Sequence, residues 1–158
     1  MPENCRLPAG VLPTILMATP SSPAIPAATL DMARASYQRC LAVADFFPSF
    51  YRSFFRIAPE IQGLFRQTDF RRQHRLLQHA VGLLLAFPTH PDDGHAILKR
   101  VAERHSRRDL DIPPRLYPRF VDALVETVAE RDPEYTDDVG DAWRAAIAPG
   151  IGFMQGRY

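Results

Sequence analysis

The amino-acid sequence predicts an all-α protein, and three observations predict it. Apolar residues recur at helical spacing from Leu30 onward, and no alternating apolar and polar run is long enough to indicate a sheet. Prolines and an Asp-Pro pair separate the periodic segments, as they do between helices. With 158 residues, of which 46% are apolar, the chain has the size of one domain with a substantial core.

The periodic segments predict six helices and one short turn begun by a proline. Thr29, either Thr68 or Asp69, and Thr136 carry side chains that cap helix N-termini. Residues 88–94 are expected to form a loop. The expected helices cover about residues 29–41, 45–57, 68–87, 98–105, 113–131 and 136–154, and the turn covers residues 59–65.

Residues 1–27 differ in composition from the rest and are rich in Pro, Ala and Ser. We interpret them as a flexible leader before a domain of residues 28–158; a wrongly chosen start codon, with Met17 or Met32 as the true start, is the alternative. The prolines of this segment exclude a helical signal-peptide core. The longest apolar run elsewhere, residues 80–87, is too short to span a bilayer.

The charges give no footprint for nucleic acid or an anionic membrane. The formal net charge is +1, with 19 basic and 18 acidic residues spread along the chain. Cys5 and Cys40 lie far apart and do not suggest a disulfide framework, so a cytoplasmic location is expected. No helix face has a distinctive dimer seam, which leaves both a monomer and a homodimer open.

One histidine stands out, because His105 closes an apolar helical stripe that also contains Leu98, Val101 and Ala102. A lone histidine in such a place is commonly a core residue that bonds to a backbone carbonyl. The alternative is a metal or haem ligand, since neutral imidazole is the commonest metal ligand in proteins. The stripe by itself leaves both interpretations open.

Four blocks of residues in register carry a resemblance to a known family. A Tyr lies eight residues before a Pro, a Phe lies six residues after that Pro, and a Gln lies four residues before a Leu. With the order of the helices, these blocks make residues 30–154 similar to the globin family, specifically bacterial single-domain haemoglobins and the haem domain of flavohaemoglobins. The matching residues are Tyr51, Pro59 and Phe65, then Gln73 and Leu77, then His105, and finally Asp141-Ala-Trp143.

The resemblance implies a globin fold, which is a 3-over-3 helical sandwich with a short or absent fourth helix, and haem b (iron protoporphyrin IX) as cofactor. It implies His105 as the iron ligand, with the carbonyl of Val101 as acceptor for the other ring nitrogen. Tyr51, Gln73 and Leu77 are implied to face the bound gas, with His74 as the alternative to Gln73 after a shift of one position. The implied haem contacts are Phe65, Gln73, Leu77, Val81, Val101, His105, Ile112, Tyr117 and Phe120.

The function implied is reversible binding of oxygen, and of NO or CO, under hydrogen-bond donors from Tyr51 and Gln73. Nitric oxide dioxygenation with a separate reductase is an extension of this function. A gas sensor that acts through a protein partner, and a haem-free helical module, are the alternatives. Two residues depart from the flavohaemoglobin pattern: Tyr117 follows His105 by twelve residues instead of ten, and Tyr158 stands where that family has a Glu.

Overall fold

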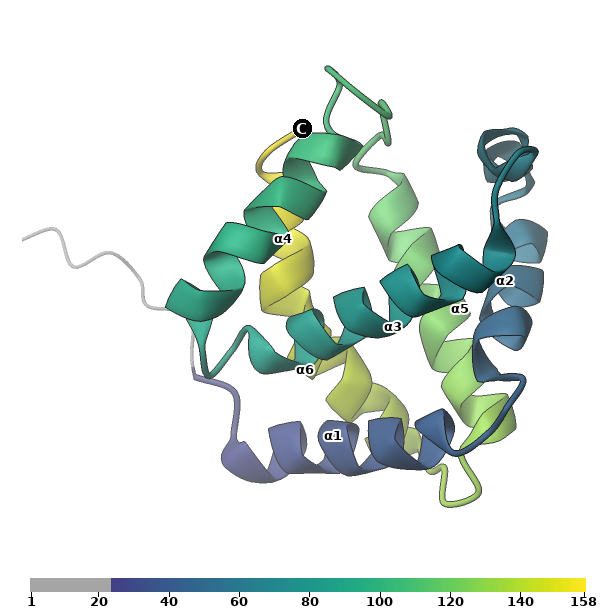
Figure 1. The fold of residues 1–158 in the computed structure, drawn as a ribbon. Helices are drawn as coiled ribbons and strands as arrows, with labels where there is room; N and C mark the ends of the chain where they lie inside the picture. Colours follow the sequence, from purple (N-terminus) through teal and green to yellow (C-terminus); the bar gives the residue numbers. More distant parts are fainter. Residues whose placement is uncertain (1–23) are drawn as a thin grey trace, which may run out of the picture.

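The computed structural model describes residues 24–158, and for residues 91–95 it describes the backbone alone. This part of the chain is all-α, as predicted, and contains no strand. None of its helices combines the length and the apolar character needed to cross a membrane. In chain order the elements are α1 (Ala27–Leu41), α2 (Phe46–Ile57), the 3₁₀ helix η1 (Pro59–Phe65), α3 (Phe70–Ala86), α4 (Pro91–His105), α5 (Leu116–Arg131) and α6 (Asp137–Gln155) (Figure 1).

Two helices begin earlier than the sequence patterns indicate. Helix α1 begins at Ala27 after Pro26, so Thr29 lies inside the helix and the prediction that it caps the N-terminus is wrong. Helix α3 ends at Ala86 and helix α4 begins at Pro91, so the loop expected over residues 88–94 is instead residues 87–90. Proline suits the first helical position because its φ angle is fixed near the helical value and its missing N–H has no partner there. Residues 1–23 of the expected leader lie outside the described residues.

The other predicted caps agree with the structure. The Asp69 carboxylate accepts hydrogen bonds from the backbone N–H groups of Arg71 and Arg72, at 3.0 and 3.3 Å. The Thr136 hydroxyl oxygen accepts one from the backbone N–H of Val139 at 3.3 Å. Between Thr68 and Asp69, the structure therefore selects Asp69 as the cap of α3.

The helices cross around one core, and α6 contacts most of the others. Helix α2 packs chiefly on α5 and helix α1 on α6, while α6 also contacts α3, α4 and α5 (Figure 1). Trp143 on α6 is fully buried, and the ring of Tyr37 from α1 meets it edge-on at 5.8 Å between centroids. Helix α6 thus packs against both α3 and α4, which carry several of the site residues expected from the sequence.

Gly150 allows α6 to approach α3 closely. A Cβ atom at this position would lie 2.6 Å from Cδ2 of Leu84 on α3 and 3.5 Å from Cδ2 of Leu98 on α4. Carbon atoms pack at about 3.5–4.0 Å, so the contact with Leu84 would be a clash. A larger residue at position 150 would therefore require the buried Leu84 side chain to shift.

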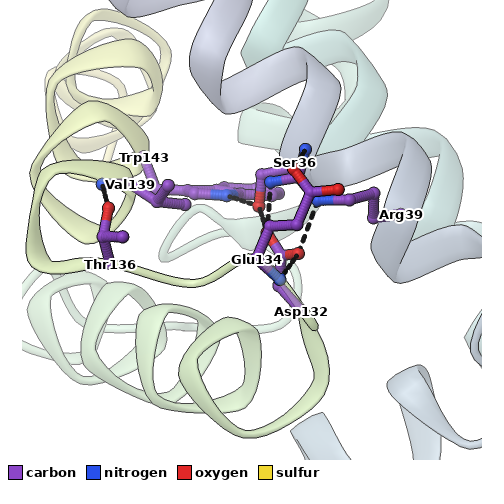
Figure 2. A network of polar contacts seen from close by, with 7 residues as sticks. All are labelled: Ser36, Arg39, Asp132, Glu134, Thr136, Val139 and Trp143. Atoms are coloured by element: carbon purple, nitrogen blue, oxygen red, sulfur yellow. Dashed lines mark hydrogen bonds and ion pairs between the residues drawn. The ribbon is translucent and has the colours of Figure 1, made fainter.

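A buried carboxylate joins α1 to the corner between α5 and α6 (Figure 2). The side chain of Asp132 has no exposed surface and accepts from the Ser36 hydroxyl at 2.5 Å. The guanidinium of Arg39 donates to both Asp132 carboxylate oxygens, at 2.6 and 2.7 Å. The indole N–H of Trp143 donates to the Ser36 hydroxyl oxygen at 2.9 Å. One network thus fixes three segments of the chain.

The pKa of Asp132 reflects two opposing effects. Burial raises it, because a carboxylate loses its hydration. The hydrogen bonds from Arg39, Ser36 and the Glu134 backbone N–H together outweigh burial, so the pKa lies below its ordinary value. A carboxylate with a depressed folded-state pKa stabilises the fold above about pH 4, and this contribution is lost as the pH falls through the folded-state value.

We predict that Asp132→Asn lowers the free energy of unfolding at pH 7 by about 3 kcal/mol, because it leaves the Arg39 guanidinium without its buried partner. Between pH 5 and pH 3 the variant loses less stability than the unmodified protein. Urea unfolding followed by circular dichroism at several pH values measures both effects. Glu134→Gln is the matched control: that side chain is 72% exposed, so its 3.3 Å ion pair with Arg39 contributes little. Equal stability of the Asn variant and the unmodified protein at pH 7 would contradict the prediction.

Candidate functional site

His105 is the last residue of α4, and its ring is oriented by the backbone of its own helix. Its Nδ1 atom lies 2.7 Å from the carbonyl oxygen of Val101, one turn earlier, as the sequence analysis expected. A carbonyl oxygen can only accept, so Nδ1 carries the proton and donates. In the neutral ring the lone pair is then on Nε2, which is the arrangement that a metal-binding histidine needs.

Burial is the main influence on the titration of His105. Desolvation lowers the pKa of the half-buried ring, and the nearby Arg104 lowers it further. The hydrogen bond to Val101 and the charge of Asp109 act in the opposite direction, and the net pKa lies below its ordinary value. The imidazole is therefore neutral at pH 7, with Nε2 available as a Lewis base.

A hydrogen-bonded turn follows His105 and closes the end of α4. The backbone N–H of Ile112 donates to the His105 carbonyl oxygen at 2.9 Å, and that of Leu110 donates to the Arg104 carbonyl oxygen at 3.0 Å. These bonds satisfy carbonyl groups that have no partner inside the helix. Asp111 adopts the left-handed region with φ 48°, which Asp tolerates better than most non-glycine residues.

The segment after α6 is tied to this turn. The Tyr158 hydroxyl donates to the Asp111 carboxylate at 2.6 Å, and the Arg107 guanidinium lies over the Tyr158 ring, 4.8 Å from its centroid. Tyr158 thus contacts the turn after the histidine. Asp109 pairs with Arg104 at 2.9 Å. Among the described residues, no carboxylate is hydrogen bonded to the His105 ring.

On α2, Tyr51 is buried in a cluster of aromatic rings. Its ring centroid lies 5.5 Å from that of Phe65 on η1 and 5.3 Å from that of Phe70 on α3. Burial raises the pKa of the Tyr51 hydroxyl to about 12, although a side-chain hydrogen bond with Gln73 acts to lower it. The hydroxyl is therefore fully protonated at neutral pH and keeps its O–H as a donor.

Gln73 and His74, the two alternatives left by the sequence, both contact Tyr51. Gln73 is half-buried and makes the polar contact with the Tyr51 hydroxyl. The His74 ring stacks on the Tyr51 ring, with centroids 5.6 Å apart and planes at 28°. The two residues thus meet different parts of one tyrosine, and no shift of register is needed to bring either into contact.

The other expected site residues divide between two apolar clusters. Leu77, Val81 and Tyr117 are buried in the main core, with Val101 and Phe120 packed against it. Ile112 packs on a smaller cluster made of Ala58, Ile61 and Leu116, and Phe65 contacts both clusters. Burial raises the pKa of Tyr117 to about 12, and among the described residues its hydroxyl has no hydrogen-bond partner.

Two phenylalanines of the aromatic cluster, Phe55 and Phe70, are not among the site residues expected from the sequence, and His74 is there only as the alternative to Gln73. Phe55 contacts the Tyr51 and Phe65 rings at 5.8 and 5.4 Å, and Phe70 and His74 contact Tyr51 from α3. A spacing of four residues separates Tyr51 from Phe55 and Phe70 from His74, so each pair shares a helix face. This spacing is a usable signal, but it cannot tell which faces of α2 and α3 meet.

These groups define what the site can bind. Within the described residues, no group of three or more His, Cys, Asp and Glu side chains could hold a metal ion. Leu77, Val81 and Tyr51 belong to one apolar cluster, and Val101 packs against it.

Two comparisons with known proteins find matches. The family model for globins matches residues 48–151. A crystal structure of a Pseudomonas aeruginosa protein, described as structurally highly homologous to a human hemoglobin, is similar with a TM-score of 0.77 and 35% sequence identity, covering 82% of this chain and 98% of that chain. A comparison with curated proteins finds no match.

We predict that Tyr158→Phe lowers the free energy of unfolding by about 0.5–1.5 kcal/mol, because it removes the hydrogen bond to Asp111 and keeps the ring under Arg107. Chemical denaturation measures the difference. Asp111→Asn is the control, since Asn keeps an acceptor oxygen and tolerates the left-handed backbone. If the two variants lost equal stability, the Tyr158 hydroxyl would have no specific role in fastening the turn.

Proposed function

Because the chain belongs to the globin family, whose members generally bind haem, we propose that it holds haem b through Nε2 of His105 and binds oxygen reversibly, with NO and CO as further ligands. One observation carries the proposal. The Val101 carbonyl oxygen fixes the proton of His105 on Nδ1 and so leaves the Nε2 lone pair for iron. Haem, when bound, supplies the iron centre that coordinates diatomic gases.

The residues around the histidine fit such a cofactor. A single protein ligand suffices, because the porphyrin supplies the remaining nitrogen ligands, and the described residues provide no rival set of ligands. Val101 and His105 would contact the proximal side, and Leu77 and Val81 the opposite side. Phe65, Ile112, Tyr117 and Phe120 would complete the apolar lining, as expected from the sequence.

We predict that His105→Gly abolishes stoichiometric haem binding with the Soret spectrum of a histidine-ligated globin, and that added imidazole restores this spectrum. The substitution removes the ligand and leaves a space for free imidazole, which supplies the same nitrogen. Absorption titration of the purified protein with haem measures both effects. His79→Gly, at an exposed position on α3, controls for general loss of stability. An unchanged spectrum in His105→Gly without imidazole would exclude His105 as the ligand.

Tyr51 and Gln73 would stabilise the bound gas by hydrogen bonding. Burial raises the pKa of the Tyr51 hydroxyl to about 12, so the phenol keeps its O–H proton at neutral pH and can donate it to a ligand. We infer that Tyr51, as a hydrogen-bond donor to a ligand that carries partial negative charge, would slow the release of that ligand.

We predict that Tyr51→Phe raises the oxygen dissociation rate about 10- to 100-fold, because a hydrogen bond to a charged group contributes about 1.5–3 kcal/mol. Stopped-flow displacement of oxygen by CO measures the rate. Tyr37→Phe is the matched control: it removes another buried tyrosine hydroxyl, which donates to the Gln78 carbonyl oxygen at 2.6 Å. An unchanged rate in Tyr51→Phe would remove the hydroxyl from the proposed function.

The proximal side favours reversible binding over oxidative turnover as the principal activity. The partner of Nδ1 in His105 is a neutral carbonyl and not a carboxylate, so the imidazole receives less negative character from its neighbour. We therefore place nitric oxide dioxygenation with a separate reductase second, as an activity that the donors Tyr51 and Gln73 would also support. Sensing through a protein partner remains the alternative without a specific observation in its favour.

A further inference from the structure

We propose that His74 is a positioning residue, which fixes the Tyr51 hydroxyl by stacking on the face of the Tyr51 ring. The inference rests on the proposed function, in which that hydroxyl donates to the bound gas. It assigns a separate role to the residue next to Gln73, on the same helix. The geometry of three aromatic rings carries it.

Phe47, His74 and Tyr51 form a stack between α2 and α3. Phe47 and Tyr51 are four residues apart and share one face of α2. The His74 ring lies 6.5 Å from Phe47 with planes at 25°, and 5.6 Å from Tyr51 with planes at 28°. The rings are thus nearly parallel, at distances typical of attractive aromatic pairs.

The contact with His74 differs from the other aromatic contacts of Tyr51. Phe50, Phe65 and Phe70 meet the Tyr51 ring in edge arrangements, with planes at 81°, 61° and 80°. Phe55 meets it at an intermediate 46°. His74 is therefore the neighbour whose ring lies along a face of Tyr51. A ring stacked on this face opposes rotation of the Tyr51 phenol ring. Such a rotation would also displace the residues that meet the Tyr51 ring edge-on.

No polar contact competes for the His74 ring. Among the described residues it makes no hydrogen bond and no ion pair, and its ring contacts are with Phe47, Tyr51 and Phe70. Burial lowers the pKa of His74 below its ordinary value, so the ring is neutral at pH 7. It therefore packs as an uncharged aromatic side chain.

Consecutive residues of α3 thus hold Tyr51 at two points. Neighbouring residues of a helix point about 100° apart, so Gln73 and His74 reach different parts of the tyrosine. Gln73 lies beside the hydroxyl, and the His74 ring stacks on the Tyr51 ring. The stacked contact constrains the plane of the Tyr51 ring and with it the position of the hydroxyl.

The test compares oxygen release in variants of the haem-loaded protein. We expect His74→Leu, which removes the ring, to raise the oxygen dissociation rate about three- to tenfold, in keeping with the strength of aromatic pairs. We expect His74→Phe, which keeps a flat ring, to stay within about twofold of the unmodified protein. His79→Leu is the matched control at an exposed position of α3. If His74→Leu fails to fold, His74→Gln gives the same comparison with a polar side chain that lacks a ring.

A double-mutant cycle separates this inference from the proposed function. If His74 acts through Tyr51, adding His74→Leu to Tyr51→Phe changes the rate by less than about 1.5-fold. The C–O stretching frequency of the CO-bound protein is an independent readout, since it reports the donor near the ligand; we expect His74→Leu to shift it toward the Tyr51→Phe value. If Tyr51→Phe changes neither quantity, the proposed role of the hydroxyl fails. The positioning role fails if Tyr51→Phe changes both the oxygen dissociation rate and the C–O stretching frequency but His74→Leu changes neither. It also fails if His74→Leu accelerates oxygen release equally in the unmodified protein and in Tyr51→Phe.

Discussion

The buried carboxylate of Asp132 is the interaction on which the placement of the site depends. A charge without water must be paired, and its partners Ser36 and Arg39 fix α1 in one register against the corner between α5 and α6. Trp143 bonds to the same Ser36 hydroxyl and so fixes the rotation of α6. Helix α6 in turn contacts α3 at Gly150.

The two sides of the site are held by different kinds of contact. His105 is oriented by backbone groups, namely the Val101 carbonyl oxygen and the turn whose Ile112 N–H bonds to its own carbonyl oxygen. Tyr51 is oriented by side chains, through its ring neighbours and Gln73. Backbone bonds within four to seven residues depend little on the rest of the fold. A tyrosine held by rings from α2, η1 and α3 depends on how those elements pack.

This difference explains what could be predicted from the sequence. The caps at Asp69 and Thr136 and the bond from His105 to Val101 involve residues at most four apart, so local spacing sufficed. The start of α4 was missed because Pro91 opens a stretch with little apolar periodicity before Leu98. The contacts of Ser36 with Asp132 and of Tyr158 with Asp111 join residues 96 and 47 apart, and no pattern in the sequence pairs them. Spacing in the sequence suggested the site residues. The stacking of His74 on Tyr51 could not be predicted in this way, because it depends on how α2 and α3 cross.

The hydrogen bond between Tyr158 and Asp111 links the end of α6 to the turn after His105, so we expect the two segments to open together. Helix ends fray more readily than helix centres, and fraying normally affects the helix alone. Here the opening of residues 155–158 releases Asp111, whose left-handed backbone is part of the turn that closes α4. The backbone bonds of Leu110 and Ile112 are thereby linked through Asp111 to the end of a helix more than forty residues away. We expect disorder at that distant end to loosen the turn after His105 before it affects the core.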